Sequence, residues 1–165
     1  MSRAYIGLGS NLDNPLAQLR RATKTLAALR ETTLARTSSI YSSRAVGPGA
    51  QPDYLNAAVA LDTALEPLAL LRELQAIEDT QGRRRAERWG ARTLDLDLLL
   101  YDDLVLETTE LTLPHPRLAE RDFVLYPLAE ISDTRTVLPG GADIDTLIAG
   151  CADNGLSHTG WQLGQ

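Results

Sequence analysis

Cysteine and long apolar runs are both scarce in this chain of 165 residues. The one cysteine, Cys151, has no second cysteine with which to form an intrachain disulfide. No stretch approaches the roughly 18 consecutive apolar residues of a membrane-spanning helix, and the apolar run near the N-terminus is too short for a signal peptide. The absences exclude a disulfide scaffold and predict a cytoplasmic protein that does not bind membranes.

Lysine and net positive charge are also lacking. Lys24 is the only lysine, and the net charge of -6 argues against nucleic-acid binding, which depends on neutralising phosphates with basic residues. The arginines nevertheless gather in one segment, as Arg83, Arg84, Arg85, Arg88 and Arg92. A high-GC genome would explain arginine in place of lysine but not this clustering, so the pattern favours one discrete anion site.

The remaining composition, 44% hydrophobic and 23% charged, is ordinary for a globular protein, and the length suits one domain over residues 1–165. Apolar periodicity predicts the order βαββαβ followed by short strands and helices. We therefore expect an α+β, ferredoxin-like sandwich with helices on one face of a mostly antiparallel sheet, and a C-terminal extension. The expected strands are 4–9, 33–41, 54–64, 93–101 and a short pair within 105–113, and the expected helices are 16–30, one from 67, 118–129 and 144–149.

Two carboxylates stand two residues apart in the predicted strand 93–101. Side chains alternate along a strand, so Asp95 and Asp97 share one face, roughly 7 Å apart, while Leu94, Leu96 and Leu98 point into the core. Neighbouring carboxylates repel each other unless a cation lies between them, and their hard oxygens suit Mg²⁺. A polar, solvated strand face is the plain alternative for such a pair, and the adjoining arginines favour two Mg²⁺ ions with a phosphorylated ligand.

The arginine segment 82–92 is polar and aperiodic, and we expect a long loop there. Arginine binds phosphate through two parallel hydrogen bonds, so a loop with several arginines could close over a triphosphate. Trp89 could stack on a flat ring or simply anchor the loop. A solvated charge run is the alternative for Arg83, Arg84 and Arg85.

A second long loop, 42–53, leads into a strand that carries Tyr54 and Asn56. The amide of Asn56 offers both a donor and an acceptor, which matches the edge of a pyrimidinone-like ring. His115 stands between Pro114 and Pro116, where it could be structural or could bind a phosphate.

These segments together resemble the 6-hydroxymethyl-7,8-dihydropterin pyrophosphokinase family of folate biosynthesis. The resemblance covers about residues 4–131, and its most specific part is the run Arg88-Trp89-Gly90-Ala91-Arg92-Thr93-Leu94-Asp95-Leu96-Asp97. The other matching segments are Gly9-Ser10-Asn11-Leu12, Gly47, Gln51-Pro52-Asp53-Tyr54-Leu55-Asn56-Ala57, Ile77-Glu78, Gly82-Arg83, Pro114-His115-Pro116-Arg117, Arg121, Phe123-Val124-Leu125 and Pro127-Leu128.

The resemblance implies a ferredoxin-like enzyme, a 2-amino-4-hydroxy-6-hydroxymethyldihydropteridine diphosphokinase, that transfers pyrophosphate from ATP to the pterin hydroxymethyl group and releases AMP. Asp95 and Asp97 would hold two Mg²⁺ ions, and Arg83 and Arg92 would share the catalytic role with them. The implied ATP-binding residues are Gln75, Glu78, Arg85, Arg88, Trp89, Arg92, Leu98, Thr112, His115, Arg117 and Arg121. The implied pterin-binding residues are Ser43, Val46, Gly47, Tyr54, Asn56, Trp89 and Phe123. Small-molecule substrates and a monomer are expected.

The sequence departs from the family pattern at some positions, with Ala91 where proline is frequent and Ser43-Arg44 where Thr-Pro is frequent. The arginine loop of this chain is one residue shorter than that of some relatives, so the match at Arg85 depends on where the missing residue is placed. Two other functions stay open on the residues alone. One is another metal-dependent phosphotransfer enzyme, such as a palm-type nucleotidyltransferase, which would usually need a third acidic ligand. The other is a non-catalytic ferredoxin-like ligand-binding module, which would leave the arginine cluster unexplained.

Overall fold

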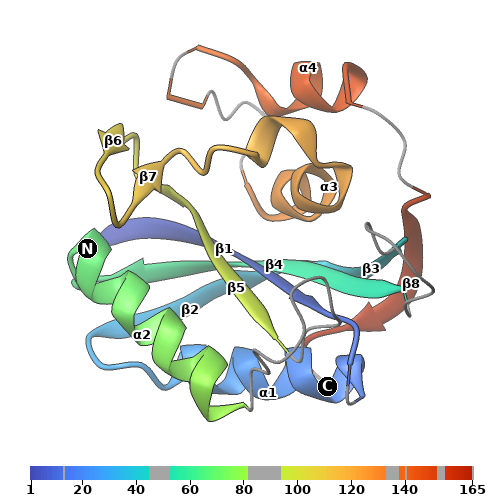
Figure 1. Cartoon of the computed structure of the whole chain (residues 1–165), viewed down its shortest axis with the longest axis horizontal. Coiled ribbons are helices and arrows are strands. Elements are labelled where there is room, and N and C mark those ends of the chain that lie inside the picture. Colours follow the sequence, from blue (N-terminus) through green and yellow to red (C-terminus); the bar gives the residue numbers. More distant parts are fainter. Residues whose placement is uncertain are drawn as a thin grey trace.

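The computed structural model describes residues 1–12, 14–44, 53–81, 94–132, 138–139, 141–151 and 155–164. A central antiparallel sheet carries helices on both of its faces (Figure 1). The elements in chain order are β1 (Ser2–Ser10), α1 (Pro15–Ala27), β2 (Thr32–Thr37), β3 (Ser39–Ser43), β4 (Tyr54–Thr63), α2 (Pro67–Thr80), β5 (Asp95–Tyr101), β6 (Leu106–Glu107), β7 (Thr112–Leu113), a 3-10 turn (Leu118–Glu120), α3 (Asp122–Ile131), α4 (Ile144–Ala149) and β8 (Ser157–Gln162).

The main sheet has the strand order β5-β1-β4-β3-β8, with β2 also paired to β4, so the ferredoxin-like prediction is confirmed. β1 lies between β4 and β5 and is antiparallel to both. The predicted single strand 33–41 is divided into β2 and β3. Ser38 is the break, because its backbone N–H donates to the Ala58 carbonyl while its hydroxyl accepts from the Ala58 N–H.

One face of the sheet packs on α1 and α2, as expected. Buried side chains from alternate positions of three strands meet the helices there, with Ile6 from β1, Leu61 from β4 and Leu96 from β5 among them. α3 lies over the other face, with α4 beside it (Figure 1). The expectation of helices on one face only is therefore wrong. A second helix layer requires small residues beneath it, and Ala58 and Ala60 of β4 supply them.

β5 changes its side-chain alternation at one point. Tyr5 of β1 pairs with Leu100, and Ile6 pairs with Leu98, so Leu99 is an extra residue between them. Such a bulge lets neighbouring side chains face the same way, and Leu99 and Leu100 both pack under α3. The bulge separates an N-terminal half of β5, in which Asp95 and Asp97 alternate with buried leucines, from a C-terminal half in which Leu99 and Leu100 are both buried.

The C-terminal extension covers an edge of the sheet. The predicted helix 144–149 is confirmed as α4, and β8, which was not predicted, pairs antiparallel with β3. The short strands expected within 105–113 form the separate β6-β7 pair. Within the described ranges, no helix has the length and apolar character needed to cross a membrane.

Candidate active site

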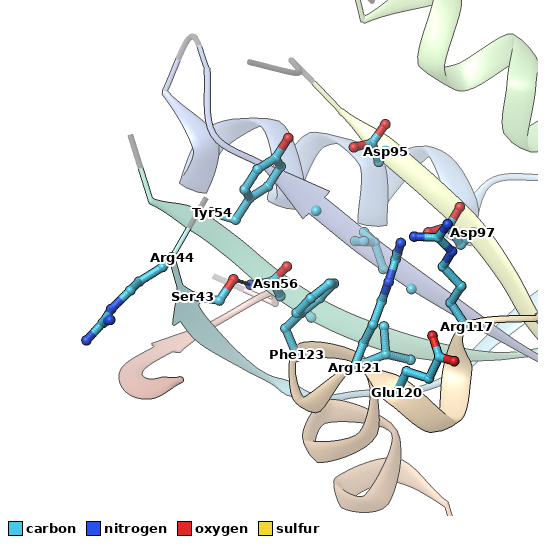
Figure 2. Close-up of a pocket in the computed structure, with 15 residues that line it drawn as sticks. Ser43, Arg44, Tyr54, Asn56, Asp95, Asp97, Arg117, Glu120, Arg121 and Phe123 are labelled. Carbon is cyan, nitrogen blue, oxygen red and sulfur yellow. Dashed lines mark hydrogen bonds between the residues drawn. The ribbon is translucent and has the colours of Figure 1, made fainter. Parts of the chain in front are cut away.

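A cavity of about 450 Å³ lies on the α3 face of the sheet. Strands β1, β3, β4 and β5 line one side of it, and residues around the 3-10 turn and the start of α3 line the other (Figure 2). Segments far apart in the sequence therefore meet here. The lining residues are Gly7, Leu8, Gly9, Ser43, Arg44, Tyr54, Asn56, Ala57, Asp95, Asp97, Arg117, Glu120, Arg121, Phe123 and Val124.

The floor of the cavity is the backbone of β1 and β4. Gly9 pairs with Asn56 in the sheet, and a Cβ atom built on Gly9 would lie 3.6 Å from Asn56 Oδ1 and 3.8 Å from Tyr54 Cδ1. A Cβ on Gly7 would lie 3.4 Å from the Leu99 side chain. The glycines thus allow a ligand to approach the sheet closely, which a larger side chain would prevent.

Polar side chains with fixed directions stand at the β3-β4 end of the floor. The Asn56 amide donates a hydrogen bond of 2.7 Å to Ser43 Oγ, between strands that pair antiparallel at this point. Both side chains are buried, with 4% of Asn56 and 3% of Ser43 exposed. With its nitrogen bound to Ser43, the amide presents Oδ1 toward Gly9 as an acceptor. Tyr54, on the same strand as Asn56, is half-buried at the edge of the cavity.

Two carboxylates form the opposite end of the cavity. Asp95 and Asp97 face the cavity, while Leu94, Leu96 and Leu98 are buried against α1 and α2, so the predicted alternation is confirmed. Asp97 keeps 44% of its side chain exposed. Among the residues that the structure describes, no group of three or more His, Cys, Asp or Glu side chains could hold a metal ion. Two half-exposed carboxylates fit a cation such as Mg²⁺ that takes its remaining ligands from water and phosphates.

His115 is held beside this carboxylate pair. Its Nε2 lies 4.0 Å from Asp97 Oδ1, its backbone N–H donates to the Leu99 carbonyl at 3.0 Å, and its Nδ1 accepts from the Arg117 N–H at 3.2 Å. Burial lowers the pKa of His115; the charge of Asp97 raises it, and the charges of Arg121 and Arg117 lower it further. The Leu113-Pro114 peptide bond just before His115 is cis.

The segment around the 3-10 turn and the start of α3 supplies cations and an aromatic ring. Arg117 and Arg121 line the same cavity as the carboxylates, and their side chains extend from this segment toward β5 (Figure 2). The Arg121 guanidinium carbon lies 5.4 Å from the centre of the Phe123 ring, within the range of a cation–π contact. Phe123 is partly buried against the α3 core and also lines the cavity. One wall therefore combines positive charge with a flat apolar surface.

Five described residues that the resemblance assigned to the nucleotide are not in the cavity lining. One is His115, which lies beside Asp97, and four others lie elsewhere. Gln75 is exposed on α2, and Thr112 is half-buried in β7. Leu98 is buried in the core, with 3% exposed. Glu78 is buried in the last turns of α2, and its carboxylate accepts a hydrogen bond of 2.8 Å from the Leu96 N–H. Their roles toward ATP stay predictions.

Other predicted site residues lie outside the described ranges. Arg83, Arg85, Arg88, Trp89 and Arg92 fall within residues 82–93, and Val46 and Gly47 fall within residues 45–52. Sequence reasoning missed several lining residues, namely Gly7, Leu8, Gly9, Arg44, Ala57, Glu120 and Val124. Arg44 and Glu120 directly follow or precede predicted site residues, which is the signal that could have found them.

An α+β fold with a polar cavity on one sheet face, acidic at one end and basic along a wall, defines a small-ligand site. A family model described as 7,8-dihydro-6-hydroxymethylpterin-pyrophosphokinase (HPPK) matches residues 5–133. The chain belongs to this family. This result favours the resemblance over the two other functions that the residues alone left open.

Relatives from several bacteria carry the name 2-amino-4-hydroxy-6-hydroxymethyldihydropteridine pyrophosphokinase. The protein of Haemophilus influenzae is 49% identical over 154 residues, covering 93% of this chain and 96% of the relative. The protein of Pseudomonas aeruginosa is 46% identical over 159 residues, covering 96% and 97%. The protein of Bacillus subtilis is 48% identical over 128 residues, covering 78% and 77%.

Solved structures share the fold. The crystal structure of wild-type Plasmodium falciparum HPPK-DHPS with SDX-DHP superposes with a TM-score of 0.63 at 14% identity over 91% of this chain. Another structure of the Plasmodium falciparum protein, with pterin and p-hydroxybenzoate, gives a TM-score of 0.66 at 15% identity. The chain spans 43% and 42% of the length of these two larger proteins. At such low identity the likeness shows the fold alone.

Proposed function

We propose that this chain transfers pyrophosphate from ATP to the hydroxymethyl group of 6-hydroxymethyl-7,8-dihydropterin, which gives the pterin diphosphate of folate biosynthesis and AMP. Membership of the family and the names of the bacterial relatives support this activity. The observation that carries it is the division of one cavity into two chemically different halves. Asn56, Ser43 and Phe123 border one half. The other half is bordered by the carboxylates of Asp95 and Asp97 and by the arginines Arg117 and Arg121.

The first half suits the pterin ring. A pterin has a flat heterocycle with donors and acceptors along one edge, and the fixed amide of Asn56 offers an oriented acceptor to such an edge. Phe123 offers its ring as a stacking surface, while Arg121 lies near the same ring. Tyr54 and Ser43 border the same space, and the resemblance adds Val46, Gly47 and Trp89.

The second half suits polyphosphate. Asp95 and Asp97 would hold the Mg²⁺ ions, and Arg117 and Arg121 line the same cavity with permanent positive charge. When bound, the metal would neutralise phosphate charge and hold the reacting groups in line. His115, 4.0 Å from Asp97, can bind a phosphate oxygen. Arg83, Arg85, Arg88 and Arg92 remain proposed ATP ligands by resemblance.

The chemistry of the transfer requires positioning and charge neutralisation more than a strong base. The hydroxymethyl oxygen of the pterin attacks the β-phosphorus of ATP, the bond from that phosphorus to the AMP oxygen breaks, and the hydroxyl proton leaves to solvent. The residues of this chain hold the pterin from one side and the phosphates from the other. Asp95, Asp97, Arg83 and Arg92 are the proposed catalytic residues. We also propose a cytoplasmic monomer.

Product analysis tests the function directly. Incubation of the protein with ATP, Mg²⁺ and 6-hydroxymethyl-7,8-dihydropterin should release AMP in equal amount to the pterin diphosphate, measured by chromatography. Release of ADP, release of free pyrophosphate, or no turnover would reject the proposal. Omission of Mg²⁺ in the presence of a chelator should abolish product formation, and light scattering of the eluted protein should give the mass of one chain.

A further inference from the structure

β5 ends the main sheet, and β1 is its only strand neighbour in the part of the chain that the structure describes. In an edge strand, alternate backbone N–H groups point away from the neighbouring strand and need other partners. Leu96 is the residue between Asp95 and Asp97. Its N–H donates a hydrogen bond of 2.8 Å to Glu78 Oε2 of α2. A helix carboxylate thus takes the place that a further strand would fill.

Burying the carboxylate of Glu78 costs free energy unless the carboxylate accepts hydrogen bonds. Its side chain is 7% exposed, and the neighbouring α2 residues Leu74 and Ile77 are buried hydrophobics. A buried carboxylate loses hydration and is tolerated only with strong hydrogen-bond partners. A leucine here would continue the apolar face of α2. The retained carboxylate therefore indicates a task that an apolar side chain cannot perform.

We infer that Glu78 is a positioning residue, which fixes the backbone of β5 between the two carboxylates so that Asp95 and Asp97 keep their places. The inference rests on the proposed role of these carboxylates in holding the metal. The charge-assisted bond to Leu96 is of the stronger kind. It holds the strand on the side opposite β1, and the segment between the two aspartates is then bound on both edges.

This role differs from the direct ATP contact that the resemblance implied. A positioning role needs an acceptor oxygen toward Leu96, which glutamine retains. A contact with metal or another cation needs the negative charge, which glutamine lacks. Glu78→Gln and Glu78→Met are therefore informative together, because both keep the length of the side chain while only Gln keeps an acceptor.

Amide hydrogen exchange measured by NMR without substrates gives a readout independent of activity. We expect the Leu96 amide to exchange about tenfold faster in Glu78→Met than in the wild type, in line with the loss of one hydrogen bond to a charged group. Glu78→Gln should retain most of the protection. Glu73→Met is the matched control on α2. The Glu73 carboxylate lies 3.8 Å from Arg30 Nε, with 34% of its side chain exposed, so its ionic partner is Arg30 and not the backbone of β5. This variant should leave the Leu96 amide unchanged.

Kinetics then separate positioning from a general loss of structure. In Glu78→Met, kcat should fall about tenfold or more and the Mg²⁺ concentration for half-maximal rate should rise about fivefold. The dissociation constant of the pterin should change less than about twofold, because its proposed partners lie on other elements. Glu78→Gln should stay within about threefold of the wild type in all three quantities.

Equal loss in Glu78→Gln and Glu78→Met would overturn the inference, since the charge itself would then be required. Unchanged Leu96 exchange in Glu78→Met would overturn it too. If Glu78→Met does not fold, Glu78→Gln alone decides. A Mg²⁺ concentration for half-maximal rate close to that of the wild type supports the positioning role, and a clearly raised one rejects it. Wild-type protein without Mg²⁺-dependent AMP release would reject the proposed function instead, and the exchange experiment would still report on the Glu78-Leu96 contact.

Discussion

The side-chain amide of Asn56 donates to the hydroxyl of Ser43 at 2.7 Å, and this contact fixes which end of the amide faces the cavity. β3 and β4 pair antiparallel at this point, so the two strands hold the donor and the acceptor in register. The orientation leaves Oδ1 beside Gly9. A ligand that places an N–H group over Gly9 meets an acceptor that is already aligned.

Asn56→Ala should weaken pterin binding about tenfold to a hundredfold, because the ligand then loses its oriented acceptor and leaves a donor unpaired. The KM for ATP should change little. Ser43→Ala should weaken pterin binding less, since Asn56 loses its brace but keeps its own groups. Calorimetric titration with the pterin measures both variants, and equal affinity of Asn56→Ala and the wild type would contradict the assignment.

Asp97→Ala should lose most activity, about a hundredfold or more in kcat, as expected for loss of a group that holds the metal. The protein should stay folded with a nearly unchanged melting temperature, because 44% of the Asp97 side chain is exposed and it serves no core contact. Asp103→Ala, in the exposed turn after β5, is the control and should keep full activity. Normal turnover by Asp97→Ala would rule out its proposed metal role.

Gly9→Val should reduce pterin affinity while the sheet remains intact. β-branched residues suit strands, but atoms beyond Cβ would extend into the cavity from a point 3.6 Å from Asn56 Oδ1. Binding of ATP with Mg²⁺ should fall less than pterin binding, because the atoms nearest to a Cβ at Gly9 belong to Asn56 and Tyr54, although Gly9 also pairs with Asp95 in the sheet. Equilibrium binding of each substrate separately measures this difference, and equal loss of both affinities would indicate a damaged fold instead.

Asp62→Asn should make the stability less dependent on pH in acid. The hydrogen bond from Arg3, at 2.7 Å, is the main cause that holds the pKa of Asp62 below its usual value. A lowered folded-state pKa adds stability above the ordinary aspartate pKa of about 3.9 and loses it as pH falls through the folded value. With 38% of both side chains exposed, the effect at pH 7 should stay below about 1 kcal/mol.

Urea unfolding at pH 7 and at about pH 2 measures this effect. The difference between wild type and Asp62→Asn should be present at pH 7 and should narrow in strong acid, as the wild-type carboxylate becomes protonated. Added salt should reduce it. A difference of the same size at both values would show that the ion pair is not its cause.

The face of the carboxylate pair could be predicted from the sequence because it depends only on strand alternation. Asp95 and Asp97 needed no knowledge of the rest of the chain. The position of Phe123 and Arg121 across the cavity depends on how α3 packs over the sheet. The sequence of residues 118–131 does not predict how α3 packs, so the assignment of Phe123 and Arg121 to the site came from the resemblance to a family.

The missed features are those in which tertiary contacts override local pattern. β8 has mostly exposed residues, such as His158 and Trp161, and it is a strand because β3 offers it an edge. The break at Ser38 depends on its paired bonds with Ala58. The α3 layer could have been suspected from Ala58 and Ala60, since small residues in a buried strand leave room for a helix.

The cavity floor at Gly7 and Gly9 has a consequence for how the site can change over time. A position that carries no side chain can gain atoms by substitution but has none to lose. Single mutations at the floor can therefore narrow the site and exclude bulky inhibitors, whereas they can hardly enlarge it to admit a bigger substrate. Adaptation toward larger ligands would have to begin at the rim, at residues such as Arg44, Tyr54 and Phe123.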